Sequence, residues 1–150
     1  MFIKKPCSYS VTRIALSAVG SLAILLWLSK PALAAQLTVT ISDVEQGKGH
    51  LMIGLYASET EFNRGKASFH TKVKAERGQE VAIFEQLPDG EYAIKMYQDE
   101  NSNNKMDFNM MGIPKEGYGF SNNVGMFGAP SYKEAKFSVK EKTAIDIDLF

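Results

Sequence analysis

The sequence predicts an all-β protein, an antiparallel β-sandwich of seven strands with one long ordered flap. Seven short stretches alternate between apolar and polar residues, which is the period of a half-buried strand. Turn-forming residues separate these stretches at close intervals, and no stretch has the period of a long helix. The alternation also predicts one solvent-facing side for each strand, unlike the continuous apolar runs of parallel sheets.

The expected elements follow from this pattern in chain order. Residues 36–44 and 50–57 both alternate strictly and flank a glycine-rich stretch, so they are expected to form an opening hairpin. Ser58 with Glu61 three residues later has the spacing of a capping box, which predicts a short helical turn. The other expected strands are 70–75, 80–87, 87–99, 135–141 and 143–150, of which 87–99 has the strongest signal because a Pro-Asp-Gly turn introduces it.

Residues 1–34 have the features of a secretory signal peptide. Residues 1–13 are basic without any acid, residues 14–28 are an apolar run, and Ala32 and Ala34 occupy the cleavage positions. Cleavage is expected after Ala34, with Ala35 the next choice, which leaves one domain over 35–150 in the periplasm or secreted. The competing interpretation is an uncleaved anchor, but the run is shorter than the roughly 20 apolar residues of a spanning helix, so no stable membrane insertion is expected after cleavage.

Charge and cysteine content exclude several function classes for the domain. The chain has 17 Lys and Arg and 17 Asp and Glu; residues 1–34 hold four of the basic residues and no acid, which leaves 13 basic and 17 acidic residues. A mildly acidic domain without a basic stripe is not expected to bind nucleic acid. The only cysteine is Cys7, so thiol catalysis and cysteine metal sites are excluded and the core alone must hold the fold.

The segment 99–134 interrupts the alternation. It contains five glycines and two prolines, yet it also contains several aromatic residues and four of the seven methionines. Long irregular connections are usually functional or disordered, and disordered segments are poor in such apolar residues. The segment is therefore expected to be an ordered flap over one end of the sandwich, with Phe108, Ile113 and Phe120 largely buried, and to carry the functional surface.

The start of the flap has the spacing of a calcium loop, with oxygen ligands at alternate positions. Asn104 stands at the position that needs an unusual backbone turn, and asparagine tolerates a left-handed conformation. The loop is not an EF-hand, because Met110 stands where the bidentate Glu belongs and a strand precedes the loop. Weak binding, on the order of 10⁻⁴–10⁻³ M, is expected. The predicted ligands are Asp99, Asn101, Asn103, the Lys105 backbone carbonyl and Asp107, with Glu100 or Glu116 the nearest source of a further oxygen.

A bare polar turn explains the same residues equally well. Asp and Asn side chains accept hydrogen bonds from their own backbone in turns, and this needs no ion. The sequence leaves both interpretations open.

The stretch DENSNNKMDFNMMGIPKEGYGFSNN, residues 99–123, resembles a family of uncharacterised secreted bacterial proteins known as the domain of unknown function DUF2141. The likeness extends to GLYASETEF, LPDGEYAIKMYQDENSN and APSYKEAKF. The family's loop usually reads Asp-x-Asn-x-Asn-Gly-x-x-Asp; here Asn104 replaces the glycine and every ligand is kept. The resemblance implies a transthyretin- or prealbumin-type β-sandwich, an immunoglobulin-like architecture, in the periplasm, and it implies no activity.

Two further surfaces of the flap suggest ligands. Tyr118 and Phe120 with the amides of Asn122 and Asn123 suit a flat polar ligand such as a sugar, although both rings can instead point inward as anchors. Four methionines invite a copper(I) site, because thioethers select that ion, but methionine also fills irregular gaps. These residues are Met106, Met110, Met111 and Met126.

No catalytic motif accompanies the two histidines, His50 and His70: the sequence contains neither G-x-S-x-G nor H-E-x-x-H. The expected function is therefore that of a small periplasmic or secreted binding or structural module of unknown ligand, not an enzyme, with calcium as its expected cofactor. The alternatives are a hydrolase-like enzyme that uses the 99–134 flap as an active-site lid, or a methionine-rich copper protein. An enzyme needs a pocket with a nucleophile–base pair, whereas a calcium-pinned loop needs only converging oxygens.

Overall fold

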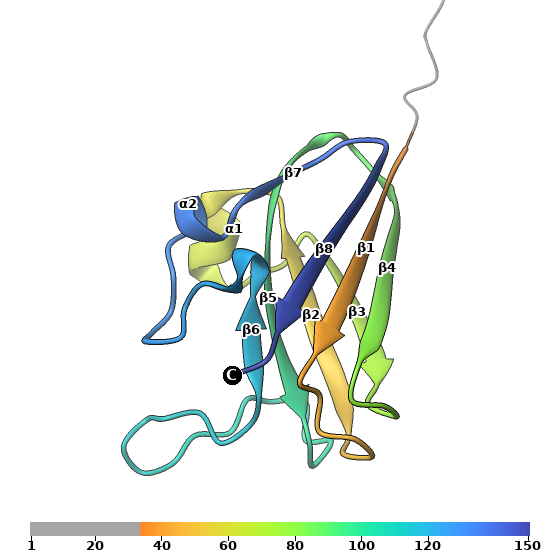
Figure 1. Cartoon of the computed structure of the whole chain (residues 1–150). Helices are drawn as coiled ribbons and strands as arrows, with labels where there is room; N and C mark the ends of the chain where they lie inside the picture. Colours follow the sequence, from red (N-terminus) through yellow and green to blue (C-terminus); the bar gives the residue numbers. More distant parts are fainter. Residues whose placement is uncertain (1–33) are drawn as a thin grey trace, which may run out of the picture. The chain divides into compact units, whose positions relative to one another are not determined.

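Residues 34–150, the part of the chain that this computed structural model describes, form two β-sheets that pack face to face (Figure 1). The smaller sheet has the strand order β4-β1-β8 and the larger has the order β3-β2-β5-β6, with the short β7 also paired to β5. The predicted signal peptide lies, apart from Ala34, outside the described residues. The strands are β1 (Ala35–Ser42), β2 (His50–Tyr56), β3 (Phe69–Lys74), β4 (Glu80–Leu87), β5 (Gly90–Asp99), β6 (Tyr118–Phe120), β7 (Phe137–Val139) and β8 (Lys142–Asp148).

The sandwich predicted from the alternation is confirmed, with eight strands in place of seven. The additional strand is β6, whose sequence Tyr-Gly-Phe is too short to show a period of two. One pair, β1 with β8, is parallel, and all other pairs are antiparallel. These two strands are the first and last of the fold, so no short turn constrains their relative direction.

The predicted opening hairpin of β1 and β2 is wrong. β1 pairs with β4 and β8, whereas β2 pairs with β3 and β5 in the other sheet. The connection between them contains Asp43, Gly47 and Gly49, all with positive φ. It also places Val44 in the core, where its N–H donates to Gly78 O at 3.1 Å. The connection therefore crosses from one sheet to the other, a choice that alternation within each strand does not encode.

The core lies between the sheets and follows the predicted alternation. Leu37, Val39 and Ile41 of β1 are completely buried, and the residues between them are partly exposed. Removal of such side chains from water contributes about 1.5–3 kcal/mol each. The same core receives side chains from both sheets, among them Leu51, Ile53, Leu55, Phe84, Leu87, Tyr92, Ile94, Met96, Val139 and Ile147.

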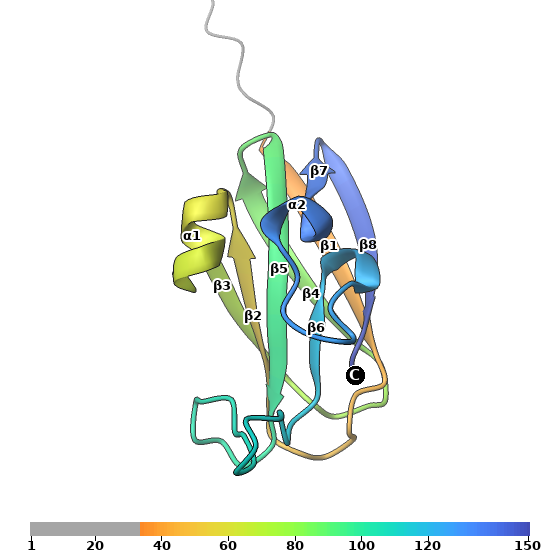
Figure 2. The same ribbon diagram turned by 90° about the vertical axis from the view of Figure 1, so that its left-hand side faces the viewer.

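Two short helices cover one end of the outer face of the larger sheet (Figure 2). Helix α1 (Glu59–Arg64) confirms the predicted turn: Ser58 accepts the Glu61 N–H at 3.3 Å, and Gly65 ends the helix in a left-handed conformation. Helix α2 (Tyr132–Ala135) begins with a capping box at Ser131. A second small core lies beneath them and consists of Tyr56, Phe62, Ala93, Tyr132 and Ala135.

The segment 99–134 is not one continuous flap. Its middle joins the larger sheet as β6 and the 3-10 turn η1 (Ser121–Asn123), and its end forms α2. The two remaining pieces, 100–117 and 124–131, are loops. The prediction that Phe108 and Ile113 are buried is wrong, since they are 53% and 52% exposed, while Phe120 is half-buried. The physical reason is that polar hydrogen bonds at the base of the first loop hold it, so its apolar side chains need no core.

Gly119 allows β6 to approach β8. A Cβ at this position would lie 2.9 Å from Ile147 Cγ2 and 3.1 Å from the Asp148 carbonyl oxygen. The neighbouring Tyr118 carbonyl also accepts the N–H of Phe150 at 2.8 Å. β6 therefore closes one side of the sandwich, and it carries Tyr118 and Phe120 to the outer face of the larger sheet.

Candidate ligand groove and polar loop

The outer face of the larger sheet carries an apolar groove of about 720 Å³ beside the two helices. Residues directly opposite each other on antiparallel strands place their side chains on the same face of a sheet. The strand register therefore builds the groove floor from two rows. One row is Lys72, Met52, Tyr97 and Tyr118, and the other is His70, Gly54, Lys95 and Phe120.

The walls of the groove come from the two loops of the 99–134 segment. Met106, Phe108 and Pro114 line it from the loop 100–117, and Gly128 and Ala129 line it from the loop 124–131. Both loops leave the sandwich on the side of this sheet face (Figures 1 and 2). The groove is thus the part of the face that α1 and α2 do not cover.

Gly54 lies in the floor of the groove. A Cβ at this position would lie 3.1 Å from the ring of Tyr56 and 3.2 Å from the Cβ of Ala67. The absence of a side chain lets Tyr56 fold over β2 into the second small core. The neighbours of Gly54 across the sheet are His70 and Lys95.

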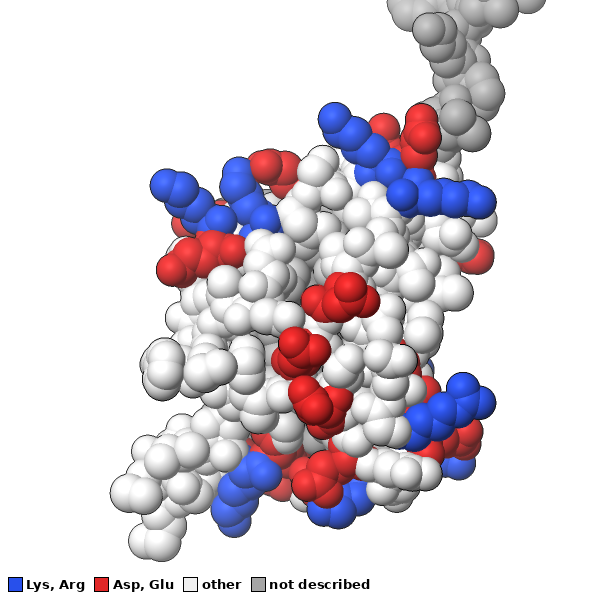
Figure 3. Space-filling model, in the orientation of Figure 1, with Lys and Arg blue, Asp and Glu red and all other residues white. Residues whose placement is uncertain are grey.

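The charges around the groove are of one sign. All 17 acidic residues lie within 34–150, yet none lines the groove, whereas two lysines and one histidine do. In Figure 3, which shows another face of the same domain, acidic side chains run along the centre, and the tip of the loop projecting at the lower left is uncharged. The exposed Met110 and Met111 belong to that loop. The groove lining therefore carries no acidic residue, although acidic residues are as numerous as basic ones in the chain as a whole.

Lys95 is the most enclosed cation of the groove. Its Nζ donates to the Phe62 carbonyl oxygen at 2.7 Å and lies 3.8 Å from the centroid of the Phe62 ring and 5.6 Å from that of Tyr56. Burial lowers the pKa of Lys95 below its ordinary value. Within residues 34–150, no carboxylate oxygen lies within 4.0 Å of this ammonium.

Hydrogen bonds within the loop 99–107 involve four of the five predicted ligand residues, Asp99, Asn101, Asn103 and Asp107. The buried Asp99 carboxylate accepts the N–H of Asn103 at 3.0 Å and the N–H of Asn104 at 2.9 Å. The side-chain amides of Asn101 and Asn103 both donate to Asp107 Oδ2, at 2.6 and 3.1 Å. Asn104 has a φ of 59°, the left-handed conformation predicted for this position.

Two of the loop's side-chain carbonyls also bond its own backbone. Asn101 Oδ1 accepts the N–H of Asn103 at 3.0 Å, and Asn103 Oδ1 accepts the N–H of Lys105 at 2.7 Å. This is the pattern of successive Asx turns, in which each side chain shapes the backbone that follows it. The Lys105 side chain itself is exposed.

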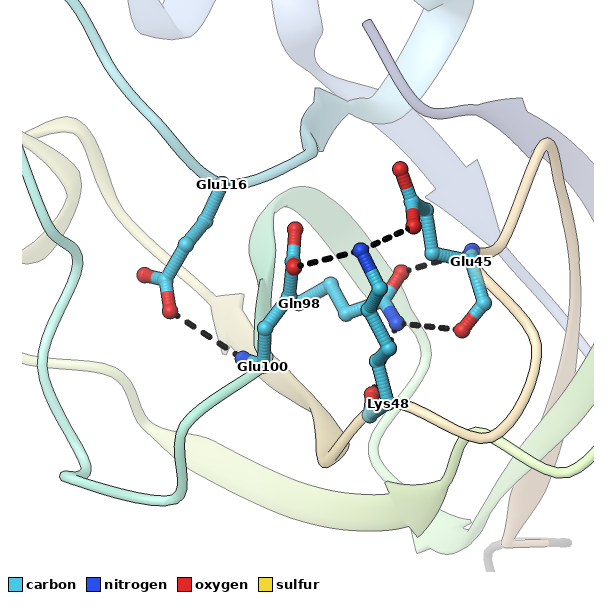
Figure 4. A network of polar contacts seen from close by, with 5 residues as sticks. All are labelled: Glu45, Lys48, Gln98, Glu100 and Glu116. Atoms are coloured by element: carbon cyan, nitrogen blue, oxygen red, sulfur yellow. Dashed lines mark hydrogen bonds and ion pairs between the residues drawn. The ribbon is translucent and has the colours of Figure 1, made fainter.

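The two glutamates considered as further oxygen donors have different partners (Figure 4). Glu116, 6% exposed, accepts the N–H of Glu100 and the N–H of Asp107. The Glu100 carboxylate instead pairs with Lys48 at 3.2 Å. Nearby, the buried Gln98 amide donates to the carbonyls of Glu45 and Lys48, both at 2.7 Å, and so fixes the end of β5. Within residues 34–150, no group of three or more His, Cys, Asp or Glu side chains has the geometry to hold a metal ion.

The predicted aromatic and amide surface divides into two parts. Tyr118 and Phe120 line the groove. Asn122 instead donates to the carbonyls of Glu134 and Lys136 at 2.9 and 3.1 Å, and Asn123 exchanges hydrogen bonds with Asp148. The amides therefore hold η1 against its neighbours and do not line the groove.

The remaining residues singled out from the sequence are spread over the domain. Met106 lines the groove, while Met110, Met111 and Met126 are exposed. His70 lines the groove, and the buried Nδ1 of His50 has no hydrogen-bond partner in the described part of the chain. Sequence reasoning missed the groove itself, including Lys95, Met52 and Tyr97. Alternation identifies their outward direction, but it does not show that this face stays open.

Comparisons with known proteins place the chain in a family without assigning an activity. Its residues 39–146 match the family model described as an uncharacterised protein conserved in bacteria, DUF2141. No curated protein and no solved structure matches the chain. Over residues 34–150, no helix has both the length and the apolar character that a membrane span requires. The sequence match covers most of the β-sandwich, and the chain belongs to this uncharacterised bacterial family, DUF2141.

Proposed function

We propose that this domain is a periplasmic or secreted ligand-binding module and that the groove on the outer face of the larger sheet is its binding site. The observation that carries the proposal is the groove's volume of about 720 Å³ together with its apolar and aromatic lining. Sites for small molecules are commonly concave, mostly apolar and on the order of 300–1,000 Å³. The localisation rests on the signal-peptide features of residues 1–34.

The lining favours an apolar ligand over a sugar. Sugar binding pairs aromatic rings with amide or carboxylate side chains, but the amides of Asn122 and Asn123 bond other parts of the chain. Met52, Tyr97 and Tyr118 form a half-exposed apolar row across the floor. A ligand that covers this row removes apolar surface from water, which is the main favourable term in such binding.

We propose further that the loop 99–107 binds calcium weakly and thereby orders one wall of the groove. The supporting observation is that Asn101 and Asn103 converge on Asp107 beside the buried Asp99 carboxylate. They do so through their amide nitrogens, so calcium binding requires both side-chain amides to turn their oxygens toward the ion. Amide and carboxylate oxygens are ligands that calcium accepts. Met106 and Phe108 in and next to this loop line the groove, so an ion bound by the loop would order residues that contact the ligand.

The groove can be tested with N-phenyl-1-naphthylamine, a neutral apolar dye whose fluorescence rises on burial. The purified protein is expected to bind it, and Met52→Glu should weaken binding by about tenfold or more, because a hydrated carboxylate then replaces part of the apolar floor. Ile83→Glu is the matched control, since Ile83 is an exposed apolar residue on β4 of the other sheet. The proposal is overturned if the wild type does not bind the dye, or if both variants bind it equally well.

A further inference from the structure

We infer that the groove accepts single-chain amphiphiles with an anionic head group and that Lys95 holds the head. This inference rests on the proposed ligand-binding function and specifies its ligand class. The observation behind it is the charge of the groove lining, which contains Lys72, Lys95 and His70 and no acidic residue.

Among the described residues, the ammonium of Lys95 has one hydrogen-bond acceptor and no carboxylate partner. An ammonium has three N–H donors, and the Phe62 carbonyl accepts one of them at 2.7 Å. The ring of Phe62 stabilises the charge through its face but accepts no conventional hydrogen bond. Partial burial without a carboxylate partner is unfavourable for the charged form, as the lowered pKa of Lys95 reflects. An oxyanion in the groove supplies the missing partner and forms a charge-assisted hydrogen bond.

The strand register gives the bound molecule a direction. Lys95 belongs to the row His70–Gly54–Lys95–Phe120. The other row, in which Met52, Tyr97 and Tyr118 follow Lys72, lies two residues further along the strands. Two residues of a strand span roughly 7 Å. With the head at Lys95, an alkyl chain runs over Met52 and Tyr97 toward Met106 and Phe108 of the loop.

The charge pattern also selects among occupants of similar shape. A cationic amphiphile would bring its head toward Lys72 and Lys95 without any acidic residue of the lining to balance it. A neutral amphiphile gains the apolar contacts but leaves Lys95 unpaired. The affinity of the groove for single-chain ligands is therefore expected to be highest for anionic, intermediate for neutral and lowest for cationic head groups.

The test compares decanoate, 1-decanol and decyltrimethylammonium below their micelle concentrations, by isothermal titration calorimetry on the purified protein. Decanoate is expected to bind about tenfold more tightly than decanol, the scale of one hydrogen bond to a charged group. Lys95→Met should remove this preference and retain decanol binding, whereas Lys95→Arg should keep it. Lys74→Met is the matched control, because Lys74, the last residue of β3, pairs with Glu76 and does not line the groove.

The outcomes separate the two proposals. The head-group assignment is wrong if decanol binds as tightly as decanoate, if decyltrimethylammonium binds most tightly, or if Lys95→Met keeps the preference for decanoate. The proposed ligand-binding function of the groove is unaffected by these three results. If none of the three probes binds, the ligand-binding function fails and this inference fails with it. Amide shift mapping on the wild-type protein gives a readout independent of the variants: decanoate must shift Gly54 and Phe120, and shifts elsewhere alone overturn the assignment.

Discussion

The buried carboxylate of Glu116 accepts the backbone N–H of Asp107 at 2.9 Å. Its second oxygen accepts the N–H of Glu100 at 3.0 Å. One side chain thus fastens both ends of the polar loop to the strand end that leads into β6. The loop wall of the groove depends on this contact, because Met106 and Phe108 stand on either side of Asp107.

Glu116→Gln should loosen this attachment. The amide has one acceptor oxygen in place of two, so one of the two N–H groups loses its partner in a buried site. The free energy of unfolding is expected to fall by about 1–3 kcal/mol, measured by urea denaturation. Glu85→Gln, at an exposed position on β4, should change it by less than about 0.5 kcal/mol. Equal effects of the two substitutions would mean that the contact does not hold the loop.

Gly49→Ala should destabilise the fold more than Gly47→Ala. Gly49 and Gly47 have positive φ values of 59° and 77°. Backbone strain at an alanine in this conformation is therefore expected to lower the free energy of unfolding by about 1–2 kcal/mol at each position. Only at Gly49 does the new Cβ meet backbone, 1.8 Å from the Asp99 carbonyl oxygen, whereas nothing lies within 4 Å at Gly47. A further 1–3 kcal/mol, roughly, is expected at Gly49. Thermal and urea unfolding of the two variants give the difference, and a difference near zero refutes the close approach.

Phe62→Ala should be among the most destabilising single substitutions in the second small core. Phe62 is 1% exposed and has edge contacts with the rings of Tyr56 and Tyr132. Removal of a buried aromatic ring costs about 3–5 kcal/mol. The same substitution at Phe127, which is fully exposed, should cost less than about 0.5 kcal/mol. Denaturant unfolding measures both; a small loss for Phe62→Ala would show that α1 is not held by this ring.

Calcium should raise the stability of the protein, and a chelator should reverse the effect. At about one hundred times the dissociation constant, binding to the folded state adds about 2.7 kcal/mol, which appears as a higher melting temperature. Asp107→Asn should abolish the gain while leaving the loop closed, because the Asp99 carboxylate still accepts the N–H groups of Asn103 and Asn104. Asp146→Asn, at an exposed position on β8, should keep it. With no shift at millimolar calcium, the loop is a polar turn only.

Local signals account for the features that were predicted correctly. The strict alternation of residues 36–42 and 90–98 gives strands whose apolar residues face the core, and Ser58 starts a helix because its oxygen is within reach of the Glu61 N–H. Asn104 was expected to adopt a left-handed conformation on the same local grounds. Each of these depends on residues within a few positions of one another.

The errors and omissions concern contacts between distant residues. The sheet to which β2 belongs, the parallel pairing of β1 with β8 and the inclusion of Tyr118–Phe120 as β6 all depend on partners far away in the sequence. The exposure of Phe108 and Ile113 depends on Glu116, whose carboxylate accepts the N–H groups of Glu100, 16 residues earlier, and of Asp107, nine residues earlier. These bonds hold the loop without a hydrophobic core.

By itself the sequence determined seven of the eight strands, their inward faces, the helical turn at Ser58 and the family, because hydrophobic period and short-range hydrogen bonds are properties of neighbouring residues. Only the tertiary structure decided which outward faces stay open. The pairing of β2, β5 and β6 places Gly54, Lys95 and Phe120 in one row, although they come from three separate parts of the chain. Strand register sets such a row, and register is fixed by the packing of the whole sandwich.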